Sequence, residues 1–262
     1  MGEGEIKRNR VRLAPLVRLS LSFDRELNLD DNQAFNKEFY HKYIERHLEA
    51  EAKLNKTLRA LLMVNTIMFL VLNGQDWTIP FAKVQVSKIP AIQEILLFYS
   101  SMTFFFVCST FVTKQCYSVI IDQCGNRIVN NDRVDPDFYN AASKYFEFFL
   151  KLYRPKLNIW GIDFFKHGWG FTVFSLVITL ILLTVVMVIP IVHIVLIVVA
   201  SMQAYQTDWN EYAKLLLIGS VVLMNFGGLA MVFGMNKNFD FFEIEHPAEQ
   251  KTESELKKTP PD

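Results

Sequence analysis

The sequence predicts an all-α membrane protein with four transmembrane helices, a long cytosolic N-terminal stalk helix and an interfacial amphipathic helix, with an optional small cytosolic β-element. Two observations lead to this fold class. Charged side chains are dense in residues 1–59, 114–166 and 237–262 and nearly absent elsewhere. The uncharged stretches between them approach or exceed the roughly 20 apolar residues that a helix needs to cross a bilayer.

Four stretches carry no charged side chain, and we assign one membrane span to each. The first is slightly short, and Lys56 and Arg59 can extend it by reaching to the membrane surface. The third is too long for a straight crossing, and Pro190 is expected to bend it by removing a backbone hydrogen bond. The predicted spans are residues 57–75, 92–113, 169–200 and 214–236.

The distribution of Lys and Arg predicts the orientation of these spans. Residues 1–59 hold twelve, residues 114–166 hold eight and the tail after residue 236 holds four, whereas the two remaining loops, 76–91 and 201–213, with the first residue of the fourth span, hold three. Positive side chains stay on the cytoplasmic side. We therefore expect an integral protein of a bacterial inner membrane, with the loop 114–168 and both termini in the cytoplasm. All four tryptophans fall at predicted membrane boundaries, where indole rings prefer to lie: Trp77, Trp160, Trp169 and Trp209.

Three segments outside the spans suggest the small β-element. Within the cytosolic segment 1–30, residues 17–23, "VRLSLSF", alternate apolar and polar side chains as a half-buried strand does. Residues 239–245 alternate less regularly and are available to pair with it. Residues 121–129 contain a candidate turn at Cys124–Gly125–Asn126. The end of the tail 237–262 has the composition of a disordered segment.

Two amphipathic helices are expected on the cytosolic side. The stalk helix, residues 31–56, begins at the capping residues Asp30–Asn32 and runs into the first span. It is either a solvated stalk with one packed face or an oligomerisation or partner-docking helix. A second helix, residues 137–153, either lies in the membrane interface or packs against the stalk.

The sequence holds few candidates for chemistry. It contains no glycine-rich phosphate loop, nucleophile elbow or paired-cysteine zinc spacing. Glu38/His41 and Glu243/His246 have the spacing of di-iron bundles, but such a site also needs two further glutamates from other helices. We therefore predict no metal, cofactor or catalytic residue. The zero net charge argues against a nucleic-acid partner, and the three cysteines are expected to be reduced thiols.

Residues 185–199, "VVMVIPIVHIVLIVV", contain a single ionisable residue, His193. A neutral imidazole can hydrogen-bond a partner such as Asn65 or Asn225, which favours a polar tie between helices over a proton or ion carrier. The uncharged polar residues singled out with it in the spans are Asn65, Ser100, Ser101, Thr103 and Asn225.

The fourth span carries a stripe of mostly small residues on one helical face, within about 80° at 100° per residue. Small residues let a second helix approach closely, so the stripe predicts a close helix contact, either within the chain or with another subunit. Ala230 and Gly234 form its tightest element. The small-residue stripe consists of Gly219, Leu223, Gly227, Ala230 and Gly234.

These observations favour a non-enzymatic multipass subunit. It would assemble in the lipid bilayer as a homo-oligomer or a larger complex and bind an unknown partner through its cytosolic half. One alternative is an oligomeric channel or pore lined by Ser100, Ser101, Thr103 or His193, or a membrane-permeabilising effector. A lipid-active enzyme, with residues 163–167 near the inner interface, is a further alternative.

Overall fold

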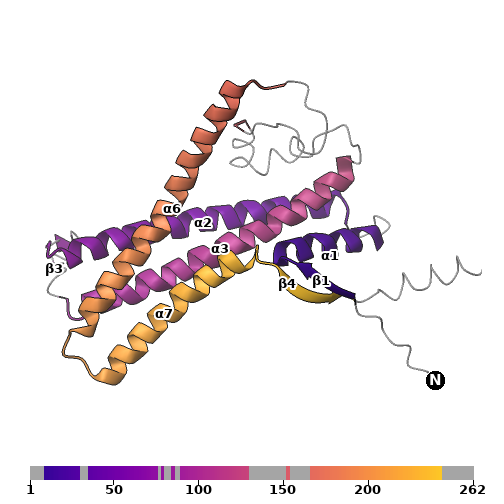
Figure 1. Ribbon diagram of the computed structural model, residues 1–262. Coiled ribbons are helices and arrows are strands. Elements are labelled where there is room, and N and C mark those ends of the chain that lie inside the picture. The colour runs from indigo at the N-terminus through magenta and orange to yellow at the C-terminus, as the bar shows by residue number, and fades with distance from the viewer. Residues whose placement is uncertain are drawn as a thin grey trace, which may run out of the picture.

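Four long helices dominate the chain (Figure 1). The computed structural model describes residues 9–29, 35–75, 78–79, 84–85, 89–129, 152–153 and 166–243. Within these residues, four helices are long and apolar enough to cross a membrane, which is the property of an integral membrane protein. They are α2 (Lys37–Leu72), α3 (Ile92–Val129), α6 (Trp169–Tyr205) and α7 (Glu211–Gly234).

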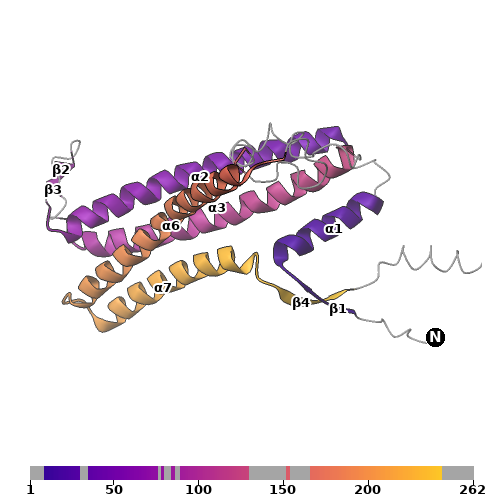
Figure 2. The same ribbon diagram turned by 45° about the horizontal axis from the view of Figure 1, so that its top comes forward.

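The two ends of this helix group differ. At one end, which we call the terminal end, helix α1 (Pro15–Leu29) lies beside a two-stranded antiparallel sheet (Figures 1 and 2). At the opposite end, which we call the loop end, α6 connects to α7 and a short pair of strands follows α2. The terminal sheet pairs β1 (Asn9–Leu13) with β4 (Phe239–Glu243), and the short pair is β2 (Thr78–Ile79) with β3 (Val84–Gln85).

Helix α2 joins the predicted stalk and the first span in one uninterrupted helix. The expected start at Asp30–Asn32 is wrong, because the helix begins at Lys37 after the cap Asn36. The Phe39 backbone N–H donates to Asn36 Oδ1 at 3.1 Å, which satisfies one of the unpaired donors of the first turn. The helix ends before Gly74, whose φ of 67° turns the chain out of the helix.

Helix α3 extends well beyond the predicted span 92–113. The predicted loop from residue 114 and the turn at Cys124–Gly125–Asn126 are wrong at these residues, because the helix continues to Val129. Its extension has an apolar face that packs at the terminal end, where Ile121 and Cys124 are buried. Tertiary packing therefore outweighs the local turn signal of a single glycine.

The segment 17–23, predicted as a strand, is instead part of α1. The segment also fits a helix that continues beyond residue 23. In that helix Phe23 and Leu27 lie four residues apart on one face, and both are buried against α2 and α3. Pro15 suits the first turn of that helix, where its missing N–H needs no partner. The strand that pairs with β4 lies earlier in the chain than predicted.

The terminal sheet joins segments that are far apart in the sequence. Arg12 lies opposite Asp240 in the register, and the neighbouring Arg10 donates a hydrogen bond to the Asp240 carboxylate. This bond, with the charge of Arg10, holds the pKa of Asp240 below its ordinary value. The Arg18 guanidinium of α1 lies 4.7 Å from the ring centroid of Phe241, which ties the helix to the sheet.

Helix α3 is central, since it contacts α1, α2, α6 and α7. Near the loop end, the apolar core draws on α2, α3, α6 and α7. Nearer the terminal end, α2, α3 and α7 supply the core. The first core includes Met68, Leu97, Ile197, Ala200 and Val221, and the second includes Leu54, Leu61, Phe104, Val107 and Cys108.

Helix α6 begins apart from the other helices and crosses them in its second half (Figure 1). It continues through Pro190 as one helix of 37 residues, about 55 Å long at 1.5 Å per residue. Between His193 and Ala204 one row of residues is buried, whereas none of residues 176–188 is buried. This stretch presents apolar side chains on every side, which suits lipid or the helices of another chain.

The contact between α3 and α7 depends on Gly228. A Cβ at this position would lie 3.1 Å from Cys108 Sγ and 3.3 Å from Cys108 Cβ, closer than side chains normally pack. The absence of a side chain at Gly228 therefore sets how near the two helices approach.

We expect Gly228→Ala to destabilise the protein by about 1–3 kcal/mol, because the added methyl group overpacks this contact. Gly228→Ala combined with Cys108→Ala should recover part of the loss, since it removes the nearest atom. Gly219→Ala is the control, because a Cβ there meets nothing within 4 Å. Unfolding in mixed micelles of mild detergent and dodecyl sulfate, followed by tryptophan fluorescence, measures the three variants. Equal stability of Gly228→Ala and Gly219→Ala would contradict the expectation.

Candidate functional site

A buried group of polar side chains lies where the four long helices meet. We call it the four-helix polar cluster, because each helix supplies one member: Asn65 from α2, Ser100 from α3, His193 from α6 and Asn225 from α7. His193 and Ser100 are fully buried, and the two asparagines are 6% exposed. The sequence singled out all four residues, and the structure brings them together.

His193 is the centre of this cluster. Its Nε2 lies 2.8 Å from Asn225 Oδ1 and its Nδ1 lies 3.2 Å from Asn65 Oδ1. Ser100 Oγ donates to Asn65 Oδ1 at 2.6 Å and lies 3.5 Å from His193 Nδ1. The imidazole therefore connects α6 to both α2 and α7, and Ser100 adds α3 through Asn65.

The hydrogen bonds of Asn225 determine where the imidazole carries its proton. The Asn225 Nδ2 amide donates to the carbonyl of Val221 at 2.8 Å, so its Oδ1 faces His193 and accepts from Nε2–H. A neutral ring protonated at Nε2 needs a donor at Nδ1. The Ser100 hydroxyl, whose Oγ lies 3.5 Å from Nδ1, is a donor within the cluster.

Apolar packing keeps this cluster dry. Along α2, Asn65 lies one turn from the buried residues Leu61 and Met68. The Phe104 ring stacks on His193, with ring centroids 4.4 Å apart and an interplanar angle of 20°. In such surroundings an unmade hydrogen bond costs more than it would in water, so the four side chains depend on one another.

The geometry of the cluster suits structure rather than reaction. Ser100 directs its short hydrogen bond to an amide oxygen and lies at a long distance from His193, so no activated nucleophile forms. The hydroxyl and imidazole are fully buried, which denies them a substrate. Among the described residues, no three His, Cys, Asp or Glu side chains gather as a metal site.

The remaining polar residues predicted in the spans lie elsewhere. Ser101 Oγ donates to the carbonyl of Leu97 at 2.9 Å, and Thr103 Oγ1 donates to the carbonyl of Tyr99 at 2.7 Å. Both side chains are buried and bond to the preceding turn of their own helix. Pro190 lies in α6 one turn before His193, where the helix leaves the bundle.

The structure divides the small-residue stripe of α7. Gly227 faces the Phe105 ring of α3, 3.5 Å from the position of a Cβ, and so has a neighbour within the chain. A Cβ at Gly219 or Gly234 would meet nothing within 4 Å. Leu223 and Ala230 are exposed. Most of the stripe therefore has no close neighbour among the residues that the structure describes.

Among the described residues, the candidate sites outside the four-helix polar cluster do not bring reactive groups together. Glu38 Oε1 pairs with Lys42 Nζ at 2.9 Å on an exposed face, and His246 lies outside the described residues. The predicted helix 137–153 also falls outside them, apart from its last two residues. His167 Nδ1 lies 3.2 Å from Thr172 Oγ1 in an exposed position.

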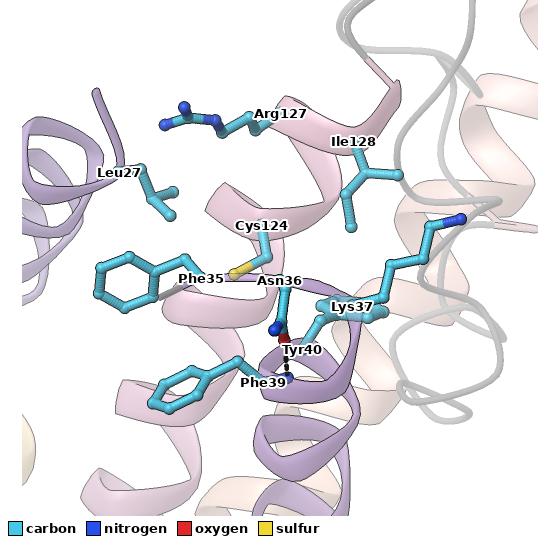
Figure 3. Close-up of a pocket in the computed structure, with 9 residues that line it drawn as sticks. All are labelled: Leu27, Phe35, Asn36, Lys37, Phe39, Tyr40, Cys124, Arg127 and Ile128. Carbon is cyan, nitrogen blue, oxygen red and sulfur yellow. Dashed lines mark hydrogen bonds between the residues drawn. The ribbon is translucent and has the colours of Figure 1, made fainter. Parts of the chain in front are cut away.

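A cavity of about 250 Å³ lies at the terminal end, between α1, the start of α2 and the end of α3 (Figure 3). Its lining is largely apolar and aromatic, and it includes the buried thiol of Cys124. Figure 3 shows the side chains of Arg127 and Lys37 pointing apart, so the two cations do not converge on one ligand.

The sequence did not single out two residues that make important contacts between the long helices. Phe104 stacks on His193, and Gly228 determines the α3–α7 approach. Phe104 is one of many phenylalanines, and no signal separates it from the others. Gly228 adjoins the predicted stripe on the face about 100° away, so a search for one stripe of small residues did not include it.

No protein family model, no curated protein and no solved structure matches this chain.

We expect His193 and Asn225 to be energetically coupled. Asn225→Leu alone should destabilise the protein by about 1–3 kcal/mol, because it leaves the His193 N–H buried without an acceptor. His193→Leu with Asn225→Leu should cost less than the sum of the single changes, with a coupling of about 0.5–2 kcal/mol. Thr184→Val on an exposed face of α6 is the control. Unfolding in mixed micelles measures the cycle, and strictly additive losses would argue against the tie.

Proposed function

We propose that this chain is a non-enzymatic multipass membrane subunit that assembles through its transmembrane helices and binds a partner through its cytosolic half. Assembly is either with copies of itself or within a larger membrane complex. The observation that carries the proposal concerns four members of the stripe. Within the part of the chain that the structure describes, a Cβ at Gly219 or Gly234 would meet no atom within 4 Å, and Leu223 and Ala230 are exposed.

Assembly is supported by the way that α7 uses its two faces. Towards the other helices it buries Val221, Asn225 and Gly228. Away from them it presents small residues at which a backbone can approach closely, above all Ala230 and Gly234. In a bilayer, helices associate through such close packing rather than through hydrophobicity, since lipid chains are equally apolar.

The terminal end has the features of a partner-binding surface. Val17, Leu21 and Phe242 are each about half exposed or more, at 47%, 48% and 62%. Leu21 and Phe242 line a groove of about 200 Å³, together with Arg18 and Arg25. Within the described residues the terminal sheet has two strands, so each presents an outer edge to which another strand can add.

The excess of Lys and Arg supports a cytoplasmic location for this end. The membrane that we propose is a bacterial inner membrane. With four spans, the segments before the first and after the last lie on the same side. The neighbouring positions of β1 and β4 agree with this arrangement (Figure 1).

The polar side chains considered for a pore face the interior of the chain. Ser100, Ser101 and His193 are fully buried, and each makes a hydrogen bond to protein. Assembly of several chains through α7 would leave them buried. We therefore favour a scaffold role over conduction.

We expect the purified protein to be an oligomer or a complex of defined size, and Gly234→Leu and Ala230→Leu to reduce that size. The larger side chains hold the partner helix away from the α7 backbone. Phe233→Leu, next to Gly234 but outside the stripe, is the control. Native mass spectrometry from mild detergent measures the masses. A monomeric wild-type protein, or an unchanged mass in both stripe variants, would overturn the assembly.

We further expect opposite accessibility at the two ends of the bundle. In intact cells a membrane-impermeant maleimide should label Asn210→Cys, in the loop between α6 and α7, and should not label Ser22→Cys in α1. Cell lysis should make Ser22→Cys reactive, which shows that the site is exposed. The parent protein measures the background from its three native cysteines. Labelling of Ser22→Cys in intact cells would reverse the orientation.

A further inference from the structure

An apolar groove of about 610 Å³ runs along α7. This helix begins after the connection from α6, at the loop end of the bundle (Figure 1). The lining combines Tyr205, the last residue of α6, with one side of residues 211–226 of α7. Its charged residues, Glu211 and Lys214, belong to the first turn of α7, and the rest of that side is apolar. The apolar part includes Leu215, Ile218, Gly219, Val222, Leu223 and Phe226.

The two charged residues lie in a fixed order along the groove. Lys214 Nζ donates to Glu211 Oε1 at 3.1 Å and lies 5.5 Å from the ring centroid of Tyr205. The Lys214 side chain is 11% exposed, whereas that of Glu211 is 72% exposed. Three residues of helix separate them, a rise of about 4.5 Å along the axis. The ammonium group is therefore the deeper charge and the carboxylate is the outer one.

Aromatic residues place this charged mouth at the membrane surface. Tyr205, Trp209 and Tyr212 surround the start of α7 and are 62%, 40% and 84% exposed. Such rings gather at the level of lipid headgroups. The charged mouth of the groove therefore lies among headgroups, and its apolar part extends into hydrocarbon.

We propose that this groove binds one zwitterionic phospholipid with a primary amine, of the phosphatidylethanolamine class. Its phosphate is the inner charge of the headgroup and meets Lys214, and its ammonium group is the outer charge and meets Glu211. Lys214 has three N–H donors, of which Glu211 occupies one, so it can also donate to a phosphate oxygen. Charge-assisted hydrogen bonds of this kind are the strong ones.

The order of charges discriminates between headgroups. An anionic phospholipid with a glycerol headgroup offers Glu211 no cation, so one half of the site opposes it. A choline headgroup carries a cation without N–H donors and cannot hydrogen-bond the carboxylate. Only an ammonium headgroup supplies both the outer cation and its donors.

Gly219 keeps the groove open for an acyl chain. A Cβ at this position would meet no atom within 4 Å, so a large side chain here fills the groove without disturbing the fold. Ala230 and Gly234, which we assign to assembly, lie outside the groove lining. The lipid site and the assembly contact can therefore be changed separately.

The test uses the full chain in nanodiscs of equimolar phosphatidylethanolamine and phosphatidylglycerol, released into mild detergent and analysed by native mass spectrometry. Wild-type protein should retain one phosphatidylethanolamine per chain. Gly219→Phe should lower this occupancy about tenfold, the effect of losing one strong contact, while Leu216→Phe, an exposed position outside the lining, should leave it unchanged. Glu211→Gln should still bind lipid but lose about tenfold in preference for the amine headgroup.

Retention of no lipid by the wild type, equal occupancy in Gly219→Phe and Leu216→Phe, or unchanged selectivity in Glu211→Gln would overturn the proposal. The same spectra report the protein mass. If Gly219→Phe dissociates the assembly, then a second helix occupies this groove and the lipid proposal is wrong. An unchanged assembly with lost lipid supports it, whatever the outcome for Ala230 and Gly234.

Discussion

The hydrogen bonds of His193 are the constraint on which the arrangement of the long helices depends. Hydrocarbon helices gain little by leaving lipid for one another, so a membrane bundle needs polar contacts or close backbone approach to define its geometry. Here one imidazole bonds to amides of two other helices, and a serine joins the third. A shift of any helix by one turn would separate these partners and leave polar groups buried without a hydrogen bond.

The course of α6 follows from this constraint. Among the described residues, its contact with the bundle is a single row, His193, Ile197, Ala200 and Ala204, at the spacing of one helical face. Beyond His193, towards the start of the helix, residues 176–188 have no buried side chain. The cluster therefore marks both where α6 is attached and where it separates. The exposed hydrocarbon of α6 and the open stripe of α7 leave most of this membrane surface to lipid or to other chains.

The terminal end extends the bundle with a different kind of contact. Helix α1 packs Phe23 and Leu27 on α2 and α3, while the sheet joins residues 9–13 to residues 239–243, directly after α7. Ile121 and Cys124 of α3 form the other side of that packing. Helix α3 thus passes from the polar cluster to the terminal end without interruption. A partner at this end would contact an element that is continuous with the membrane part.

The apolar spans are predictable from the amino-acid sequence, and His193, Asn65, Ser100 and Asn225 are among the polar residues that the sequence singles out within them. Charged side chains are costly in the hydrocarbon core, so the spans lack them and can be located from the positions of charged residues alone. Only the packing of the folded chain shows that those four residues meet, that Gly228 makes the tightest contact of α7 with α3, and that residues 17–23 and 121–129 are helical. These outcomes depend on which faces bury against which neighbours. Short alternating or turn-like segments fit both strand and helix until a partner surface selects one of them.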